Sequence, residues 1–458
     1  MVFSSLIFLF FFLPAVLLCY YAVPQRFLSV RNGVLLAFSL FFYFYGEPRL
    51  IALLFLSIAL NYFFGLLMRS PYRKIWLVLC VFCNVAMLGV YKYLNFFIST
   101  ANSVFSTSTP LLDIVMPIGI SFYTFQALSY VVDVYRRQAW PQKNPFSLAL
   151  YISMFPQLIA GPIVRYRDVD DRIAQRAHTV AGFSEGIDRF IYGLAKKVLL
   201  SNVFAQIADG IWLRPTDELT FLLSWFGAAA YTLQIYYDFS GYSDMAIGLG
   251  KMFGFQFLEN FNYPYISRSV TEFWRRWHMS LSSWFRDYVY IPLGGNRCSS
   301  KRHIFNLLVV WGLTGFWHGA NFTFLAWGLY FGVLLICEKY ALAKLLDRLP
   351  RVLTHLYALF FIVIGWVLFR SDTLSYALDY LRVMLTPSLT VDPQMIEYLA
   401  RFWPYLLCGV VLSAPIYPRL AKRKAFVLLS YPLLAALLVL CVMSLLNNSY
   451  NPFIYFRF

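Results

Sequence analysis

The stretch Phe426-Val-Leu-Leu-Ser-Tyr-Pro-Leu-Leu-Ala-Ala-Leu-Leu-Val-Leu-Cys-Val-Met-Ser-Leu-Leu446 contains no charged residue. Its length is about the 20 residues that an α-helix needs to cross the hydrocarbon core of a bilayer. Backbone polar groups in lipid must be bonded internally, and the chain lacks the alternating pattern of barrel strands. This stretch therefore predicts a transmembrane helix.

The rest of the chain has the same character. Of its 458 residues, 60% are hydrophobic and 13% are charged, whereas about a quarter are charged in soluble domains. A larger soluble core cannot hide this excess, because cores stop growing and chains divide into domains instead. We therefore expect an all-α polytopic membrane protein with roughly 10–12 transmembrane or re-entrant helices. Six further blocks are nearly free of charge: Val2–Leu18, Leu50–Met68, Ile75–Val90, Phe221–Ile235, Leu353–Leu368 and Phe402–Ala414.

Basic residues indicate the orientation of the chain. The net charge of +16 comes from Lys and Arg in short loops, which is typical of the positive-inside rule and gives no reason to expect nucleic-acid binding. Arg26 and Arg31 follow the first block, whereas Ser99–Pro110 is uncharged. The alternation predicts an N-terminus outside the cytoplasm. The first block lacks a basic leading region, so it is interpreted as an uncleaved span.

The middle of the chain is less regular. Met116–Val134 is apolar but contains Pro117 and Gly119, and Phe146–Val164 contains Pro156. Irregular backbone at membrane depth is tolerated only where it is buried in protein or lines a cavity. These breaks favour re-entrant segments around a cavity, and ordinary kinked helices are the alternative. We expect one domain over 1–458, with N-terminal spans (1–110), a catalytic core with re-entrant and interfacial helices (111–340) and C-terminal spans (341–458).

Two motifs known from soluble proteins are discounted. Cys80 and Cys83 form a CxxC inside an apolar block with no second pair, so no metal site or structural disulfide is expected. Gly182–Gly186 matches GxSxG, but no buried strand precedes it, and Ser184 is more typical of a helix cap.

His318 lies in Trp311-Gly-Leu-Thr-Gly-Phe-Trp-His-Gly-Ala320. The apolar segments Phe305–Phe316 and Phe322–Cys337 flank it, and both lead to basic stretches, which predicts a membrane hairpin with His318 at its turn. About 15 residues separate it from His303, a rise of roughly 22 Å. An ionisable side chain at that depth is costly and indicates function; a buried structural histidine is the alternative.

His278 lies in Glu272-Phe-Trp-Arg-Arg-Trp-His-Met-Ser280, where aromatic residues continue at helical spacing to Tyr288. The pattern is typical of an interfacial helix with aromatic side chains among the headgroups. His278 is either part of that packing or a second polar member of a reaction chamber. The basic face carrying Arg275 and Arg276 could attract the phosphates of a nucleotide donor.

Asp238 and Asp244 follow a membrane block in a stretch rich in hydroxyl groups. They could pair with Arg275 or Arg276, which is a structural role. Alternatively, they could orient a catalytic imidazole, since a histidine base is commonly held by a third group.

Together these segments resemble the membrane-bound O-acyltransferase (MBOAT) family. Within it they are most similar to the bacterial alginate O-acetyltransferases, peptidoglycan O-acetyltransferases and teichoic-acid D-alanyltransferases, and Tyr290–Arg297 looks most like the alginate branch. The stretches that carry the resemblance are Pro117–Gln126, Phe155–Pro162, Asp238–Asp244, Phe273–Ser282, Tyr290–Arg297 and Thr314–Gly319.

The resemblance implies a ring of helices around a central funnel, with His318 catalytic and His278 in the active site. It further implies acetyl-coenzyme A as the acyl donor, with no permanently bound cofactor and no metal. Trp274, Trp277, Arg275 and Arg276 are the candidate donor-binding residues. The candidate supporting residues are Asp238, Asp244, Trp317, Gly319 and Asn321.

Such proteins lie in the bacterial inner membrane. The resemblance predicts an acyl group passed across the membrane to an exopolysaccharide such as alginate, through a separate periplasmic esterase-like acetyltransferase and polysaccharide synthesis or export proteins. Peptidoglycan O-acetylation and D-alanyl transfer to teichoic acid are the alternatives within the family. A polytopic transporter and a scaffold for polysaccharide export are alternatives of other classes.

Overall fold

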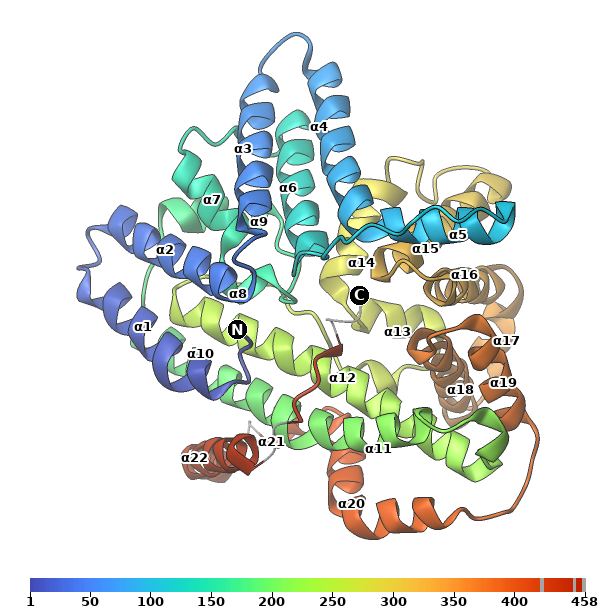
Figure 1. The fold of residues 1–458 in the computed structure, drawn as a ribbon. Coiled ribbons are helices and arrows are strands. Elements are labelled where there is room, and N and C mark those ends of the chain that lie inside the picture. The colour runs from blue at the N-terminus through green and yellow to red at the C-terminus, as the bar shows by residue number, and fades with distance from the viewer. Residues whose placement is uncertain (421–423, 448–449, 455–458) are drawn as a thin grey trace. The chain divides into compact units, whose positions relative to one another are not determined.

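The protein is described by a computed structural model, which covers residues 1–420, 424–447 and 450–454. Every regular element in these ranges is a helix (Figure 1). Five helices are long and apolar enough to cross a membrane, and two shorter apolar helices span Phe8–Ala22 and Ile51–Leu67. The predicted all-α polytopic fold is therefore confirmed. The five long segments are Leu28–Gly46, Arg73–Phe105, Arg351–Arg370, Pro393–Leu412 and Leu429–Asn447.

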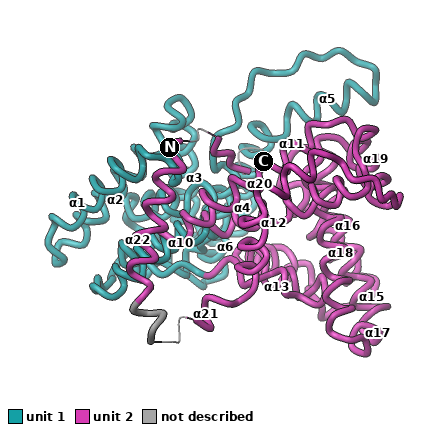
Figure 2. Tube along the Cα trace, turned by 90° about the horizontal axis from the view of Figure 1, so that it is seen from below, with its two compact units in different colours: residues 1–190, 243–258 teal, residues 191–242, 259–458 magenta. Residues whose placement is uncertain are grey.

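The chain forms two compact units, which are described separately (Figure 2). Unit 1 comprises residues 1–190 and 243–258, and unit 2 comprises residues 191–242 and 259–458. The first part of unit 1 contains α1 (Leu13–Ala22), α2 (Leu28–Gly46), α3 (Ile51–Leu67), α4 (Arg73–Leu88), α5 (Leu94–Phe105), α6 (Ile120–Tyr135), α7 (Pro145–Ser153), α8 (Phe155–Leu158) and α9 (Tyr166–Ala174).

Two long helices enter both units: α10 (Val180–Ala195) and α12 (Phe221–Met252). Between them a π-helical segment, Lys196–Ser201, leads into α11 (Asn202–Trp212). The remainder of unit 2 contains α13 (Val270–Arg276), α14 (Met279–Phe285), α15 (Ser300–His318), α16 (Phe322–Cys337), α17 (Ala343–Arg348), α18 (Arg351–Arg370), α19 (Leu374–Leu385), α20 (Pro393–Leu412), α21 (Tyr417–Leu420) and α22 (Lys424–Asn447).

The irregular middle of the chain is buried in unit 1. Helix α6 packs between α3 and α4 (Figure 1), and nearly all of its side chains are buried. It begins only after Gly119, whose φ of +75° is a left-handed conformation that favours glycine. A Cβ there would lie 2.7 Å from the carbonyl oxygen of Leu158. The segment Phe146–Val164 contains α8 and most of α7, two short helices, which agrees with the predicted interruption.

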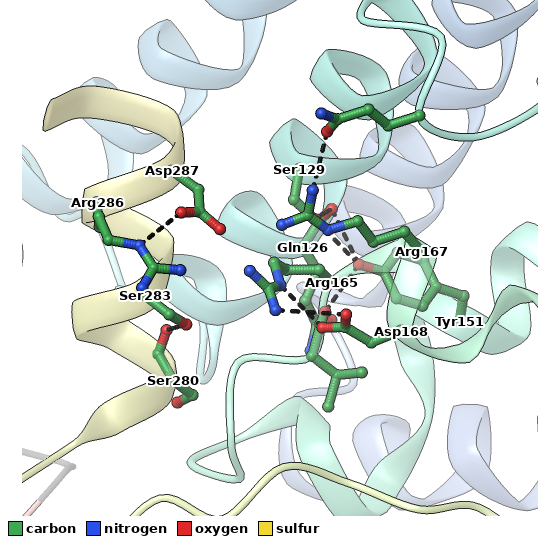
Figure 3. Close-up of polar contacts among 12 residues, drawn as sticks. Gln126, Ser129, Tyr151, Arg165, Arg167, Asp168, Ser280, Ser283, Arg286 and Asp287 are labelled. Atoms are coloured by element: carbon green, nitrogen blue, oxygen red, sulfur yellow. Dashed lines mark hydrogen bonds and ion pairs between the residues drawn. The ribbon is translucent and has the colours of Figure 1, made fainter. Parts of the chain in front are cut away.

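Hydrogen bonds satisfy some of the polar groups in this buried region (Figure 3). Ser129 on α6 donates to the carbonyl oxygen of Gln126 over 2.8 Å, and the hydroxyl of Tyr151 on α7 donates to Val164 O over 2.8 Å. Bonding of this kind is required where water is excluded. It explains how non-helical backbone near Val164 is tolerated in an apolar interior.

Tyr20 connects α1 to the loop after α9. Its hydroxyl oxygen accepts a hydrogen bond from Arg176 at 2.7 Å and lies 2.8 Å from Nε2 of His178. Burial, together with the charges of Arg176 and Arg31, lowers the pKa of His178 from 6.5 to about 4. The imidazole is therefore neutral in the folded protein at neutral pH.

This lowered pKa predicts a loss of stability in acid. Between pH 6.5 and about 4 the unfolded chain takes up a proton at His178 that the folded chain does not, so unfolding is favoured as the pH falls. We expect the thermal unfolding midpoint in detergent to fall less over this window in His178→Gln than in the wild-type protein. Equal pH slopes for the two proteins would contradict the assignment.

In unit 2, α15 and α16 form the predicted hairpin, and their backbones touch. A Cβ on Gly328 would lie 2.3 Å from the carbonyl oxygen of Trp311 and 3.0 Å from Cα of Gly315. A Cβ on Gly315 would lie 2.3 Å from Phe324 O. These contacts are with backbone atoms, which cannot rotate away as a side chain does, so glycine is required at both positions.

Substituting Gly328→Ala should therefore destabilise the hairpin by about 1–3 kcal/mol through overpacking. The matched control is Gly312→Ala on α15, where the nearest atom to an added Cβ is 3.9 Å away. We expect that control to unfold at or slightly above the wild-type temperature, because alanine favours helix more than glycine does. Thermal unfolding in detergent measures both, and equal effects would contradict the close contact.

Candidate active site

His318 is the last residue of α15, at the turn of the hairpin, and is 5% exposed. Aromatic rings surround it edge to face: the centroids of Trp317 and Trp327 lie 4.9 Å from that of its imidazole, and that of Phe369 lies 5.2 Å away. A Cβ on Gly319 would lie 2.3 Å from the Phe324 ring. The turn is thus packed closely enough to hold the imidazole in place.

A small cavity adjoins His318 in unit 2. Its free space is about 10 Å³ for the centre of a water-sized sphere, close to the least that holds one water. Apart from His318 and one carboxylate, its wall is aliphatic and aromatic, so a group inside it is largely removed from bulk water. The cavity is lined by Ile235, Asp238, Phe239, Trp277, His318, Trp327, Trp366, Phe369 and Ile454.

Asp238 is the carboxylate in this wall, and it is paired with Lys197. Their charged atoms lie 2.5 Å apart, and their side chains are 2% and 3% exposed. Asp238 also accepts a hydrogen bond from the backbone N–H of Ile454 at 2.9 Å, and Lys197 donates to Pro452 O. The suggested pairing of Asp238 with Arg275 or Arg276 is wrong, because the π-helical segment brings Lys197 to the carboxylate instead.

Asp244 lies six residues further along α12, in unit 1. Its partner is Arg189 on α10, whose Nη2 lies 2.6 Å from the carboxylate. Pairing with Arg275 or Arg276 was therefore wrong for this carboxylate also. Asp244 has a structural contact between two helices, and the cavity lining does not include it.

His278 lies between α13 and α14 with a left-handed φ of 45°. The aromatic stripe therefore belongs to two short helices, and the expectation of one continuous helix is wrong. Met279 N donates to Asn260 O at 2.9 Å, and this bond helps to stabilise the break between the helices. The stripe is also buried in protein: Trp277 and Trp284 are 3% and 6% exposed.

The His278 ring is 2% exposed, and its Nδ1 lies 3.1 Å from Oδ1 of Asn260. It packs against Phe239 at 5.2 Å between centroids and against Trp317 at 6.4 Å. Burial lowers its pKa to about 3, so the ring is neutral. His278 and His318 thus share Trp317 as a neighbour, but His278 does not line the cavity.

Of the four candidate donor-binding residues, only Trp277 lines the cavity. Trp274 packs against Trp311 at 4.7 Å between centroids. Arg275 is exposed, and Arg276 is paired with Glu272 at 2.9 Å. The structure therefore separates the aromatic pair, which is buried, from the arginines, which are accessible at the end of α13.

Asn321 caps α16, since its Oδ1 accepts a hydrogen bond from Thr323 N at 3.0 Å. Its Nδ2 donates to Asp372 O at 2.8 Å, so its observed contacts are structural. No group of three or more His, Cys, Asp or Glu residues able to hold a metal occurs among the described residues.

Sequence reasoning missed several residues of this site. Lys197 was not among the predicted site residues, although a lysine followed by Val-Leu-Leu could have indicated burial. Trp327 and Trp366 are 1% exposed and line the cavity. Nε1 of Trp327 has no hydrogen-bond partner among the described residues. The indole ring lies 4.9 Å from the imidazole of His318 between centroids, so a hydrogen-bond donor is available close to that residue. Nothing in their local sequence distinguishes these tryptophans from ordinary core residues.

The fold and the site define a polytopic helical membrane protein with a histidine held inside its protein interior. Residues 141–369 match the membrane-bound O-acyltransferase family, MBOAT. Relatives cover most of the chain. A probable alginate O-acetylase of Azotobacter vinelandii is 43% identical over 386 residues, which cover 82% of this chain and 76% of that protein.

A probable alginate O-acetylase of Pseudomonas putida is 39% identical, with 100% of both chains covered. A peptidoglycan O-acetyltransferase of Helicobacter pylori is 36% identical over 84% of this chain and 80% of that protein. This chain belongs to the MBOAT family and is a membrane O-acyltransferase.

The buried pair predicts a large effect of removing one charge. In Lys197→Met the Asp238 carboxylate loses its cation, which should cost about 3–5 kcal/mol of folding stability. The double variant Lys197→Met/Asp238→Leu should recover part of this loss, because no charge is left unpaired.

The control for this pair is Lys251→Met, which removes an exposed ion pair with Glu185, 34% and 64% exposed. Surface pairs contribute about 0–1 kcal/mol. Denaturation of the detergent-solubilised proteins measures all three variants. A Lys197→Met protein no less stable than Lys251→Met would refute the pair's role.

Proposed function

We propose that this protein transfers an acetyl group from acetyl-coenzyme A to the hydroxyl groups of a bacterial cell-envelope glycan, with an exopolysaccharide such as alginate as the first candidate. The observation that carries the proposal is the imidazole of His318, held at the turn of the α15–α16 hairpin beside a mostly apolar cavity. An imidazole is the side chain best suited to accept and return protons near neutral pH. The relatives that are probable alginate O-acetylases support the class of acceptor.

In the proposed reaction an acceptor hydroxyl attacks the thioester carbonyl while His318 takes its proton. A new C–O bond forms, the C–S bond breaks, and the leaving thiolate takes a proton back from the imidazolium. Such general base catalysis is typically worth about 10²–10⁴ in rate. The mostly apolar cavity wall excludes water, which protects the thioester from hydrolysis.

The size of the cavity favours a short acyl group. Its free space is close to that of one water, so an acetyl group needs only small movements of the surrounding rings, whereas a long acyl chain would need the aromatic cluster to open. A D-alanyl group is bulkier and carries an ammonium, which a wall lined mainly by Trp277, Trp366 and Phe369 would desolvate at a cost.

The remaining parts of the proposal concern direction and partners. The donor enters from the cytoplasm and the acceptor or an intermediate carrier is reached from the periplasm of the inner membrane, with the N-terminus periplasmic. A periplasmic esterase-like acetyltransferase receives the group, and polysaccharide synthesis or export proteins act with it. Peptidoglycan O-acetylation is the second candidate, because a peptidoglycan O-acetyltransferase is 36% identical over 84% of the chain.

The proposal predicts that His318→Ala lowers acetyl transfer by about 10²–10⁴-fold, the usual contribution of a general base, while the protein still inserts and folds. The measurement is release of coenzyme A and of labelled acetyl product from acetyl-coenzyme A in membrane vesicles. The control is His355→Ala on α18, whose Nδ1 lies 3.0 Å from Ser267 O and which does not line the cavity.

Retained transfer in a folded His318→Ala protein would overturn the catalytic assignment. A loss of equal size in His355→Ala would show that the effect is structural. Mass spectrometry of secreted and cell-wall glycans from cells with and without the gene identifies the acceptor. An unchanged glycan acetyl content would contradict the proposed class of acceptor.

A further inference from the structure

Unit 1 contains a group of basic side chains outside the candidate active site. Arg172 and Arg176 come from α9 and the loop after it, His178 lies two residues on, and Arg31 comes from α2. Tyr20 joins them, since its hydroxyl oxygen contacts both Arg176 and His178. In the described part of the chain no Asp or Glu lies within ion-pair distance of these three arginines.

Arg176 is 6% exposed, yet its hydrogen bonds reach only neutral oxygen atoms. Nε donates to Phe253 O at 2.9 Å, Nη1 donates to Arg172 O at 3.2 Å, and Nη2 donates to the hydroxyl of Tyr20 at 2.7 Å. A guanidinium has five N–H donors, so these three acceptor atoms leave donors on both terminal nitrogens for another group.

Arg31 is 5% exposed and is placed in a similar way. Its Nε donates to Val23 O at 2.9 Å, and its guanidinium lies 5.1 Å and 5.2 Å from the ring centroids of Tyr20 and Tyr21. Its Nη1 has no hydrogen-bond partner among the described residues. Cation–π contacts compensate only part of the cost of removing a guanidinium from water.

Two buried guanidinium groups therefore lie close together, and no carboxylate of the described residues is within ion-pair distance of either. Burial, and then the charges of both guanidinium groups, lower the pKa of His178, which agrees with both charges lying near the loop that carries it. A buried charge is ordinarily paired, and like charges brought together destabilise the fold unless an anion joins them. An anion bound from outside the chain would neutralise them.

A hollow of about 690 Å³ opens beside this group, and Arg172 and Arg176 are in its wall. Arg172 is half-buried and donates to the side-chain oxygen of Gln256 at 3.0 Å, which orients its guanidinium. The rim also holds Asp171, whose carboxylate repels an anion from that side and so confines it to the arginines. The hollow is lined by Gln25, Asp171, Arg172, Ala174, Gln175, Arg176 and Ala177.

We propose that this hollow is a binding site for a phosphate-bearing anion, with Arg172 and Arg176 as its direct ligands and Arg31 as a supporting charge. Planar guanidinium forks match the oxygen atoms of a phosphate and bind it through paired, charge-assisted hydrogen bonds. The phosphate belongs either to a soluble nucleotide or to a lipid headgroup. The proposal is independent of the acetyl-transfer function, because none of these residues lines the His318 cavity.

The test measures binding to the full-length protein in nanodiscs, in two arms. In the first arm the lipid is phosphatidylcholine alone, and inorganic pyrophosphate and adenosine 3′,5′-bisphosphate are titrated by calorimetry. In the second arm no soluble anion is added, and nanodiscs containing phosphatidylglycerol are compared with phosphatidylcholine nanodiscs by thermal unfolding. Each arm uses wild type, Arg172→Gln and the control Arg69→Gln, an exposed arginine of the same unit.

We expect one arm to show binding that Arg172→Gln weakens about tenfold, the worth of one charged hydrogen bond, and that Arg69→Gln leaves unchanged. A response in the first arm identifies a soluble phosphate as the ligand, and a response in the second alone identifies a lipid headgroup. Arg172 is half-buried, so its loss should leave the fold intact, which the unfolding curve verifies. No response in either arm, or equal weakening by Arg69→Gln, overturns the proposal.

Discussion

The contact between the backbones of α15 and α16 is the constraint on which the candidate active site depends. Gly315 and Gly328 bring the two helices so close that a single added methyl group would meet main-chain atoms. Because the hairpin is closed this tightly, its turn has little freedom, and His318 is held against Trp327 and Phe369. Preorganisation of this kind lets an imidazole act without the cost of reorienting it during the reaction.

The aromatic packing around the turn follows from the same constraint. Trp327 lies one residue before Gly328, so the close helix contact also fixes its indole beside the imidazole. Trp366 and Phe369 come from α18, which packs on α16, and they close the other side of the cavity. The cavity is therefore formed mainly by residues of helices, with Trp277 added from the break between α13 and α14 and Ile454 from the segment after α22. Positioning on helices is what a fixed catalytic group requires.

The hairpin, the buried histidine and the helical fold were predictable, because hydropathy and the placement of charges act locally and are visible in sequence. The partner of Asp238 was not predictable. Lys197 lies far from it along the chain, and only the π-helical turn after α10 brings its ammonium to the carboxylate. The break at His278 was also hidden, because it depends on hydrogen bonds to Asn260, and helical spacing continues on both sides of it.

Lys197 differs from Arg31 and Arg176 in its partners. This difference distinguishes a charge that stabilises the fold from charges that are available to bind a ligand. The ammonium of Lys197 is matched by a carboxylate at 2.5 Å, so its charge is neutralised within the fold and no further anion is required. Arg31 and Arg176 are as deeply buried but are bonded only to neutral oxygen atoms and aromatic rings. Burying such charges without a partner costs several kcal/mol per ion even after relaxation. Arg176 lies beside an open hollow, so an anion bound there from outside the chain would offset the free-energy cost of burying these charges.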